Sequence, residues 1–141
     1  MSIRAILLPL FVEVALTSGL MLWMAYARTV AIKRKQARMA DVALGQPNWP
    51  VRVQQISNCY ASQFQLPVLF YVLTVLVIVT RHADFVFVVM AWLFVASRLV
   101  HAYIHTGSNY VPHRFNAFAI GSLILLAMWL IFAVRFLLAL P

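Results

Sequence analysis

The sequence predicts an all-α membrane protein in which a single domain, residues 1–141, forms a bundle of four transmembrane helices. Two observations lead to this class. Hydrophobic residues make up 65% of the chain and charged residues only 10%, too few to cover the surface of a water-soluble domain. In addition, four apolar segments are each long enough to cross about 30 Å of hydrocarbon, at about 5–27, 50–80, 83–104 and 115–140.

The first segment, 5–27, precedes a basic loop. Six of the eleven Lys and Arg residues lie between Arg28 and Arg52, and we expect Lys33–Arg38 to continue the first helix into water. A cleaved signal peptide is rejected because the apolar stretch is too long and dense positive charge follows it. Since positive residues gather in cytoplasmic loops, we expect this loop and the third loop, residues 105–114, to be cytoplasmic, with both termini outside.

The distribution of positive charge also indicates which binding partners to expect. Nucleic-acid-binding proteins spread Lys and Arg over a solvated face, whereas here the net charge of +8 is concentrated in one loop between membrane segments. Nucleic acid is therefore rejected as a partner, and anionic membrane lipid is the expected contact of the loop.

The second segment, Pro50–Thr80, has 31 residues, about 46 Å of helix, so its first turns should project beyond the bilayer. Asn48 or a neighbour is expected to cap its start, with Pro50 in the first turn. Pro67 removes one backbone donor and should kink the helix near Gln63.

Polar side chains in the second segment recur with spacings of three and four residues, which places them on one helix face. They are Gln55, Asn58, Ser62 and Gln65. Two interpretations remain open: hydrogen bonds between helices, or the wall of a polar pocket that is entered from the cytoplasm. The single cysteine, Cys59, lies in the same segment and is interpreted as an inert, small apolar residue.

The third and fourth segments supply positive and ionisable groups. Arg98, His101 and His105 share one face of the third. Arg114 begins the fourth, where free helix amides favour anions, although at the membrane interface it could equally anchor a lipid headgroup. Metal binding is rejected because no carboxylate or thiolate accompanies the histidines. The three polar sets together indicate a pocket without a carboxylate, suited to an anionic amphiphile or a peptide-like ligand.

Glu13, in the outer half of the first segment, is the one acidic residue that we expect inside the membrane. Because a buried charge is costly inside a bilayer, it needs a partner or must be neutral. We expect it to pair with Arg135 of the fourth segment, within or between subunits, with a protonated Glu13 as the alternative.

Two stretches of the chain resemble the MAPEG family, the membrane-associated proteins of eicosanoid and glutathione metabolism. Residues 58–71, Asn-Cys-Tyr-Ala-Ser-Gln-Phe-Gln-Leu-Pro-Val-Leu-Phe-Tyr, are similar to its second-helix signature, closest to the bacterial branch. Arg98, His101 and Arg114 recur at the separations of its third-helix and loop motif.

The resemblance implies a homotrimer in a bacterial inner membrane, with glutathione bound between subunits at the cytoplasmic side. It implies a transferase or peroxidase that passes the glutathione thiolate to a lipophilic electrophile from the bilayer. Arg114 matches the residue that would stabilise the thiolate and is the candidate catalytic residue. The candidate glutathione-binding residues are Asn58, Ser62, Gln65, Arg98, His101, His105 and, from the end of the first helix, Arg34 or its neighbour Lys33.

The chain also departs from the family pattern. Ser62 and Gln65 stand where the glutathione enzymes have asparagine and glutamate, His105 stands for a tyrosine, and Phe115 stands for a serine of some members. A glutamine lacks the charge that would hold an amino group. These departures favour an alternative function, a non-catalytic protein that binds lipid or another amphiphile on the same scaffold. A small structural subunit of a larger membrane complex is the third possibility.

Overall fold

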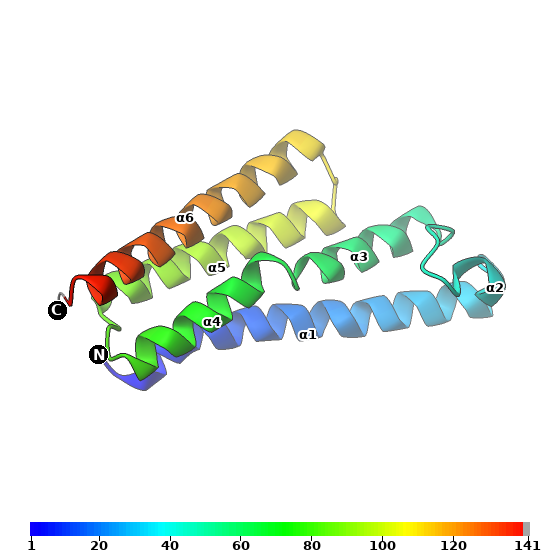
Figure 1. Cartoon of the computed structure of the whole chain (residues 1–141). Coiled ribbons are helices and arrows are strands. Elements are labelled where there is room, and N and C mark those ends of the chain that lie inside the picture. The colour runs from blue at the N-terminus through cyan, green and yellow to red at the C-terminus, as the bar shows by residue number, and fades with distance from the viewer. Residues whose placement is uncertain (140–141) are drawn as a thin grey trace.

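The computed structural model describes residues 1–139, which form six helices and contain no strand. They are α1 (Ile3–Lys33), α2 (Met39–Val42), α3 (Val51–Ser62), α4 (Leu66–Val79), α5 (Phe85–Thr106) and α6 (Val111–Leu137). Four stretches are long and apolar enough to span a membrane, with α3 and α4 together making the second (Figure 1). The predicted all-α bundle of four spanning helices is confirmed.

The two ends of the bundle differ in charge. The N-terminus, the C-terminal end of α6 and the α4–α5 connection lie at one end, called here the terminal end (Figure 1). The other, called the basic end, consists of α2 with the flanking residues 34–50 and the α5–α6 connection, residues 107–110. The first and third loops therefore lie on the same side of the bundle, in the arrangement that the sequence predicted.

Helix α1 ends earlier than expected at the basic end. Ser2 caps its start by accepting a hydrogen bond from the Ala5 amide, and the helix ends at Lys33. The expected continuation through Arg38 is wrong, because Lys35 adopts a left-handed backbone conformation (φ 56°) that no α-helix contains. The basic residues that follow α1 therefore belong to a turn and to the loop around α2.

The start of the second span also differs from the expectation. Pro50, not Asn48, is the N-cap of α3, and it makes no side-chain capping bond. The Asn48 amide group instead donates to the Asp41 carbonyl at 2.7 Å. Asn48 thus closes the loop onto α2 rather than capping the next helix.

The second span breaks where the sequence predicted a kink. Helix α3 ends at Ser62, and α4 begins at Leu66 with Pro67 in its first turn, a position that tolerates the missing proline N–H. Between them, the amides of Gln63, Phe64 and Gln65 bond carbonyls three residues back, a tighter pattern than an α-helix. Pro67 therefore produces a full break near Gln63, which leaves backbone carbonyls at the end of α3 without their helical partners.

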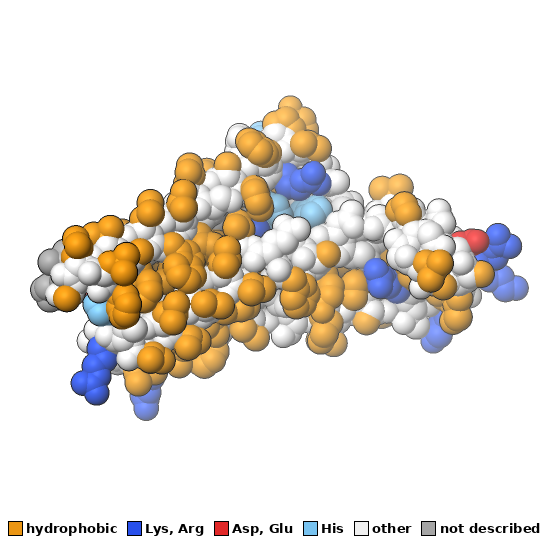
Figure 2. Space-filling view, in the orientation of Figure 1, with side chains coloured by type: hydrophobic (Ala, Val, Ile, Leu, Met, Phe, Trp, Pro, Cys, Tyr) orange, Lys and Arg blue, Asp and Glu red, His pale blue; other side chains and the backbone are white. Residues whose placement is uncertain are grey.

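Tight packing holds α5 against α6. A Cβ added at Gly121 would lie 2.6 Å from the Ser97 hydroxyl oxygen, so the absent side chain allows the close approach of the two helices. Small residues at such contacts are typical of membrane bundles, where association depends on packing rather than on the hydrophobic effect. The main buried cluster joins α1, α4, α5 and α6, and includes Phe70, Leu73, Phe94 and Leu125. Large apolar side chains cover much of the outside of the bundle (Figure 2).

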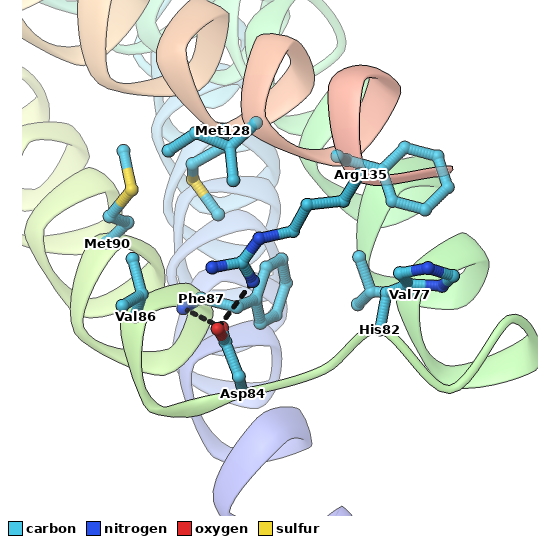
Figure 3. A pocket seen from close by; sticks show the side chains of 10 residues that line it. Val77, His82, Asp84, Val86, Phe87, Met90, Met128 and Arg135 are labelled. Atoms are coloured by element: carbon cyan, nitrogen blue, oxygen red, sulfur yellow. Dashed lines mark hydrogen bonds and ion pairs between the residues drawn. The ribbon is translucent and has the colours of Figure 1, made fainter. Parts of the chain in front are cut away.

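At the terminal end, an ion pair connects α5 and α6. Asp84 is the N-cap of α5, where it accepts a hydrogen bond from the Phe87 amide at 2.9 Å and another from the Arg135 guanidinium (Figure 3). Partial burial alone would raise the pKa of the Asp84 carboxyl, but the Phe87 and Arg135 hydrogen bonds outweigh it, so this pKa lies below its usual 3.8. The expected Glu13–Arg135 pair is therefore wrong, because Arg135 is engaged by Asp84.

Candidate functional site

A hollow of about 390 Å³ opens on the side of the bundle, towards the basic end. Helices α3, α5 and α6 form its wall, together with the break between α3 and α4. The lining residues are Asn58, Ser62, Gln65, His101, His105, Val111, Arg114, Phe115 and Phe118. Figure 2 shows basic and histidine side chains at the surface between α3 and the start of α6. We call this hollow the side pocket.

Six of the eight residues predicted for the site line the side pocket together. They are Asn58, Ser62, Gln65, His101, His105 and Arg114. Of the four polar residues on the second span, Gln55 differs from the rest, because its amide donates to the carbonyls of His105 at 2.6 Å and Gly107 at 2.8 Å. Gln55 thus makes the inter-helix hydrogen bonds of the first interpretation. Asn58 and Gln65 line the pocket, as in the second interpretation, and Ser62 does both, because it lines the pocket and also accepts a hydrogen bond from Arg98 of α5.

Arg98 lies behind the pocket wall and is not among the lining residues. Its side chain is 1% exposed, and its Nη2 donates to the Ser62 carbonyl at 3.3 Å and to the Ser62 hydroxyl at 3.2 Å. The Ser62 hydroxyl in turn donates to the Cys59 carbonyl at 2.7 Å. Arg98 therefore donates a hydrogen bond to the last carbonyl of α3, next to the Pro67 break, and it fixes the position of Ser62 in the wall.

The counter-ion of Arg98 is Glu13 on α1. The Glu13 side chain is 0% exposed, and its Oε1 lies 4.0 Å from the Arg98 Nε, without a direct hydrogen bond between the two groups. A charge in the membrane interior is expensive unless it is compensated, so the two side chains need each other. Cys59, also fully buried, packs beside this region against Leu20 and Ala102, in agreement with an inert apolar role.

Counting residues from the terminal end shows how the sequence could have indicated this pair. Glu13 lies ten residues after the start of α1 and Arg98 thirteen after the start of α5, about 15 and 20 Å deep. Arg135 lies two residues before the end of α6, only about 3 Å deep. At these depths Glu13 lies near the level of Arg98 and far from that of Arg135, which is why the expected Glu13–Arg135 pair does not form.

The two histidines form the α5 side of the side pocket. The rings of His101 and His105 are buried and meet edge to face, with centroids 5.4 Å apart. Neither Nδ1 atom has a hydrogen-bond partner among residues 1–139. Both rings line the pocket, and these two buried nitrogen atoms are unsatisfied within the described residues of one subunit.

Arg114 faces these rings from the first turns of α6. It is half-buried, and its Nη1 donates to the Asn109 side-chain oxygen at 2.7 Å, which holds the guanidinium over the α5–α6 connection. None of the nine lining residues is acidic. With a guanidinium, two imidazoles, a hydroxyl and two amides, the side pocket is chemically suited to an anion that carries additional hydrogen-bonding groups.

Arg34 lies away from the side pocket. It follows the end of α1 and is exposed to solvent at the basic end. Within one subunit, Arg34 and the pocket therefore do not form a single site. Among residues 1–139, no group of three His, Cys, Asp or Glu side chains is arranged to hold a metal ion.

Comparison with known proteins agrees with the motifs of the sequence. The model of the MAPEG family matches residues 6–134, nearly the whole chain. No curated protein and no solved structure gives a significant match. The matched region contains all four spanning stretches except the last residues of α6 and the first of α1, together with every residue of the side pocket. This chain is a membrane protein that belongs to the MAPEG family.

Proposed function

We propose that the chain is a glutathione-dependent transferase or peroxidase that acts on lipophilic electrophiles in the membrane. The observation that carries this proposal is the composition of the side pocket, in which Arg114, His101 and His105 converge and no lining residue is acidic. Glutathione is a peptide with two carboxylates and a thiol that must become a thiolate. Each of these groups gains from neighbouring cations and amides.

The residues of the side pocket would divide this work. His101 and His105, whose rings line the pocket, orient the peptide, and Asn58 and Ser62 hydrogen-bond its backbone. Arg114, aided by the free amides at the start of α6, favours the thiolate over the thiol. The thiolate sulfur then bonds to the electrophilic carbon, the leaving group departs with its electron pair, and the thiol proton passes to water.

Gln65 decides how well glutathione fits. A carboxylate at this position would pair with the ligand's ammonium group, whereas the Gln65 amide oxygen accepts only a neutral hydrogen bond. The remaining donors match the two carboxylates and the thiolate, so the residues present fit the anionic parts of glutathione better than its amino group.

The proposal includes a homotrimer in a bacterial inner membrane, with both termini on the non-cytoplasmic side. The side pocket opens on the flank of one subunit, and a neighbouring copy packed there would cover it. Arg34 lies outside the pocket of its own subunit, so it would act on the pocket of a neighbour.

A second candidate function is a non-catalytic binder of lipid or another anionic amphiphile. Gln65 and the exposed, apolar Phe115 favour this function, since both lie on the pocket wall and neither assists glutathione chemistry. An amphiphile would place its acidic group against Arg114 and its apolar part against Phe115 and Phe118.

Arg114→Ala tests the proposal against this alternative. The purified protein in detergent should conjugate glutathione to a chloro-nitro aromatic, and the variant should lose that activity while keeping its oligomeric state. Arg4→Ala, an exposed arginine at the terminal end, removes the same charge and should retain activity. A wild-type rate equal to the uncatalysed rate, with no rise in melting temperature on adding glutathione, would reject the transferase. A co-purifying lipid detected by native mass spectrometry would then support the binder.

A further inference from the structure

A second groove lies at the basic end, away from the side pocket. It has a volume of about 420 Å³ and lies between the last turns of α1, the start of α2, and Trp49, which comes shortly before α3. Its lining residues are Arg28, Thr29, Ile32, Lys33, Met39 and Trp49. Two of these are cations, and the others present mainly apolar surface, so the groove joins positive charge to an apolar wall. It shares no lining residue with the side pocket.

Arg28 is held in place from two sides. Its guanidinium carbon lies 5.1 Å from the centre of the Trp49 ring, and its Nε donates to the Ser57 hydroxyl at 3.2 Å. A cation over an aromatic face is attracted to it and keeps its charge. The arginine is therefore positioned before any ligand arrives.

Within residues 1–139, no carboxylate neutralises the two cations of the groove. The chain has three acidic residues, and within residues 1–139 each has another partner: Glu13 pairs with Arg98, Asp41 with Arg38 and Asp84 with Arg135. Arg28 and Lys33 have no ion-pair partner in this part of the chain. An acidic group from outside the chain is the natural complement of this pair of cations.

Exposed apolar side chains, and a second tryptophan under an arginine, lie towards the same end of the bundle as the groove. Met39, Leu44 and Val51 are between 71% and 90% exposed, and Trp23 lies beneath the Arg52 guanidinium at 5.1 Å. Tryptophan and arginine next to exposed apolar residues are typical of the boundary between lipid headgroups and acyl chains. The groove is therefore at a depth where a headgroup and the first part of an acyl chain are both within reach.

We propose that this groove is a binding site for an anionic phospholipid. The phosphate lies between the Arg28 guanidinium and the Lys33 ammonium, and the acyl chain passes along Ile32 and Met39 with Trp49 as the upper wall. A zwitterionic phospholipid also has a phosphate, but its own cation competes with the two basic side chains. An additional acidic charge in the headgroup region is therefore preferred.

The test compares phosphatidylglycerol with phosphatidylcholine of the same acyl chains, added to the delipidated protein in neutral detergent. Binding is measured by native mass spectrometry and by the rise in melting temperature. The wild type should bind phosphatidylglycerol more tightly. Arg28→Gln/Lys33→Gln should weaken phosphatidylglycerol binding by about 10- to 30-fold, at about 1 kcal/mol for each charge near a membrane surface, and leave phosphatidylcholine binding little changed.

The matched control is Arg4→Gln/Lys35→Gln. It removes the same charge from exposed positions that do not line the groove, and it should keep most of the preference for phosphatidylglycerol. Because Arg28 also bonds Ser57, Lys33→Gln alone provides a variant whose exposed side chain does not support the fold. It should show about half of the loss in binding free energy. Equal binding of the two lipids by the wild type, or equal losses in both double variants, would overturn the proposal.

Discussion

Replacing Glu13 by glutamine tests whether the buried pair with Arg98 supports the membrane fold. The substitution keeps the size of the side chain and removes its charge, while Arg98 stays 1% exposed and keeps its hydrogen bonds to Ser62. Breaking a buried pair from one side costs about 3–5 kcal/mol, because the remaining charge is uncompensated. Because the two groups are 4.0 Å apart without a direct hydrogen bond, and Arg98 keeps its bonds to Ser62, we expect a loss at the low end of this range, about 3 kcal/mol.

A double variant that removes both charges distinguishes the effect of the pair on stability from its effect on the shape of the side pocket. In Glu13→Gln/Arg98→Met no uncompensated charge remains, so the double variant should recover most of the stability lost in Glu13→Gln. It should not recover binding in the side pocket, because Ser62 loses the two hydrogen bonds that Arg98 donates.

Unfolding by sodium dodecyl sulfate in mixed micelles, followed by circular dichroism, gives the free energies. A thermal-shift titration with glutathione gives the binding. Arg81→Gln, an exposed charge at the terminal end, serves as the control and should change neither quantity. A loss below about 1 kcal/mol in Glu13→Gln, the range of an exposed pair, would refute the buried-pair argument. So would a double variant less stable than Glu13→Gln itself.

Two further predictions concern the contact between α5 and α6. Gly121→Ala should lower the free energy of unfolding by no more than about 1 kcal/mol, since the new methyl group displaces only the Ser97 hydroxyl from its bond to the Phe94 carbonyl and the helix gains from losing a glycine. Gly121→Ala/Ser97→Ala removes the clash and should be more stable than Gly121→Ala in the same assay. The Asp84–Arg135 pair should make stability pH-dependent: the lowered pKa of Asp84 means that its contribution is complete above the ordinary value of 3.8 and is lost as the pH falls through the lower, folded value. The melting temperatures of the wild type and of Asp84→Asn should differ at pH 7 and approach each other as the pH is lowered. A difference that stays constant with pH would contradict the prediction.

The spans, the break and most of the side pocket were predictable from the sequence because each depends on local chemistry. A bilayer of fixed thickness selects apolar stretches of fixed length, so the four spans follow from composition. Pro67 lacks an amide wherever the helix lies, so the break near Gln63 follows from one residue. The spacing of Asn58 from Ser62, and of His101 from His105, fixes a common helix face without knowledge of the neighbours.

The ion pairs were harder to predict from the sequence, because each joins two different helices and depends on how those helices pack. Glu13 pairs with Arg98 because α1 packs against α5, a contact that no local pattern in α1 indicates. The capping of α5 by Asp84 was not predicted, although an aspartate just before an apolar run is a recognised signal for the start of a helix. The end of α1 at Lys33 depends on the left-handed conformation of Lys35, which no residue type in that basic run requires.

The position of the chain's buried acid bears directly on what the side pocket can hold. Pro67 breaks the second span. At the end of α3 the Ser62 carbonyl accepts hydrogen bonds from the Gln65 amide and from Arg98, which lies behind the wall. Arg98 then needs a negative charge, and Glu13 supplies it from α1, a helix that contributes no residue to the pocket wall. The carboxylate that compensates this arginine is thus inside the bundle, while the wall that a ligand meets contains Arg114 and no acid. We therefore expect the pocket to select a ligand by its negative charge. Gln65→Glu would put a carboxylate into the wall, so it should strengthen binding of glutathione, which carries an ammonium group, and weaken binding of a purely anionic amphiphile.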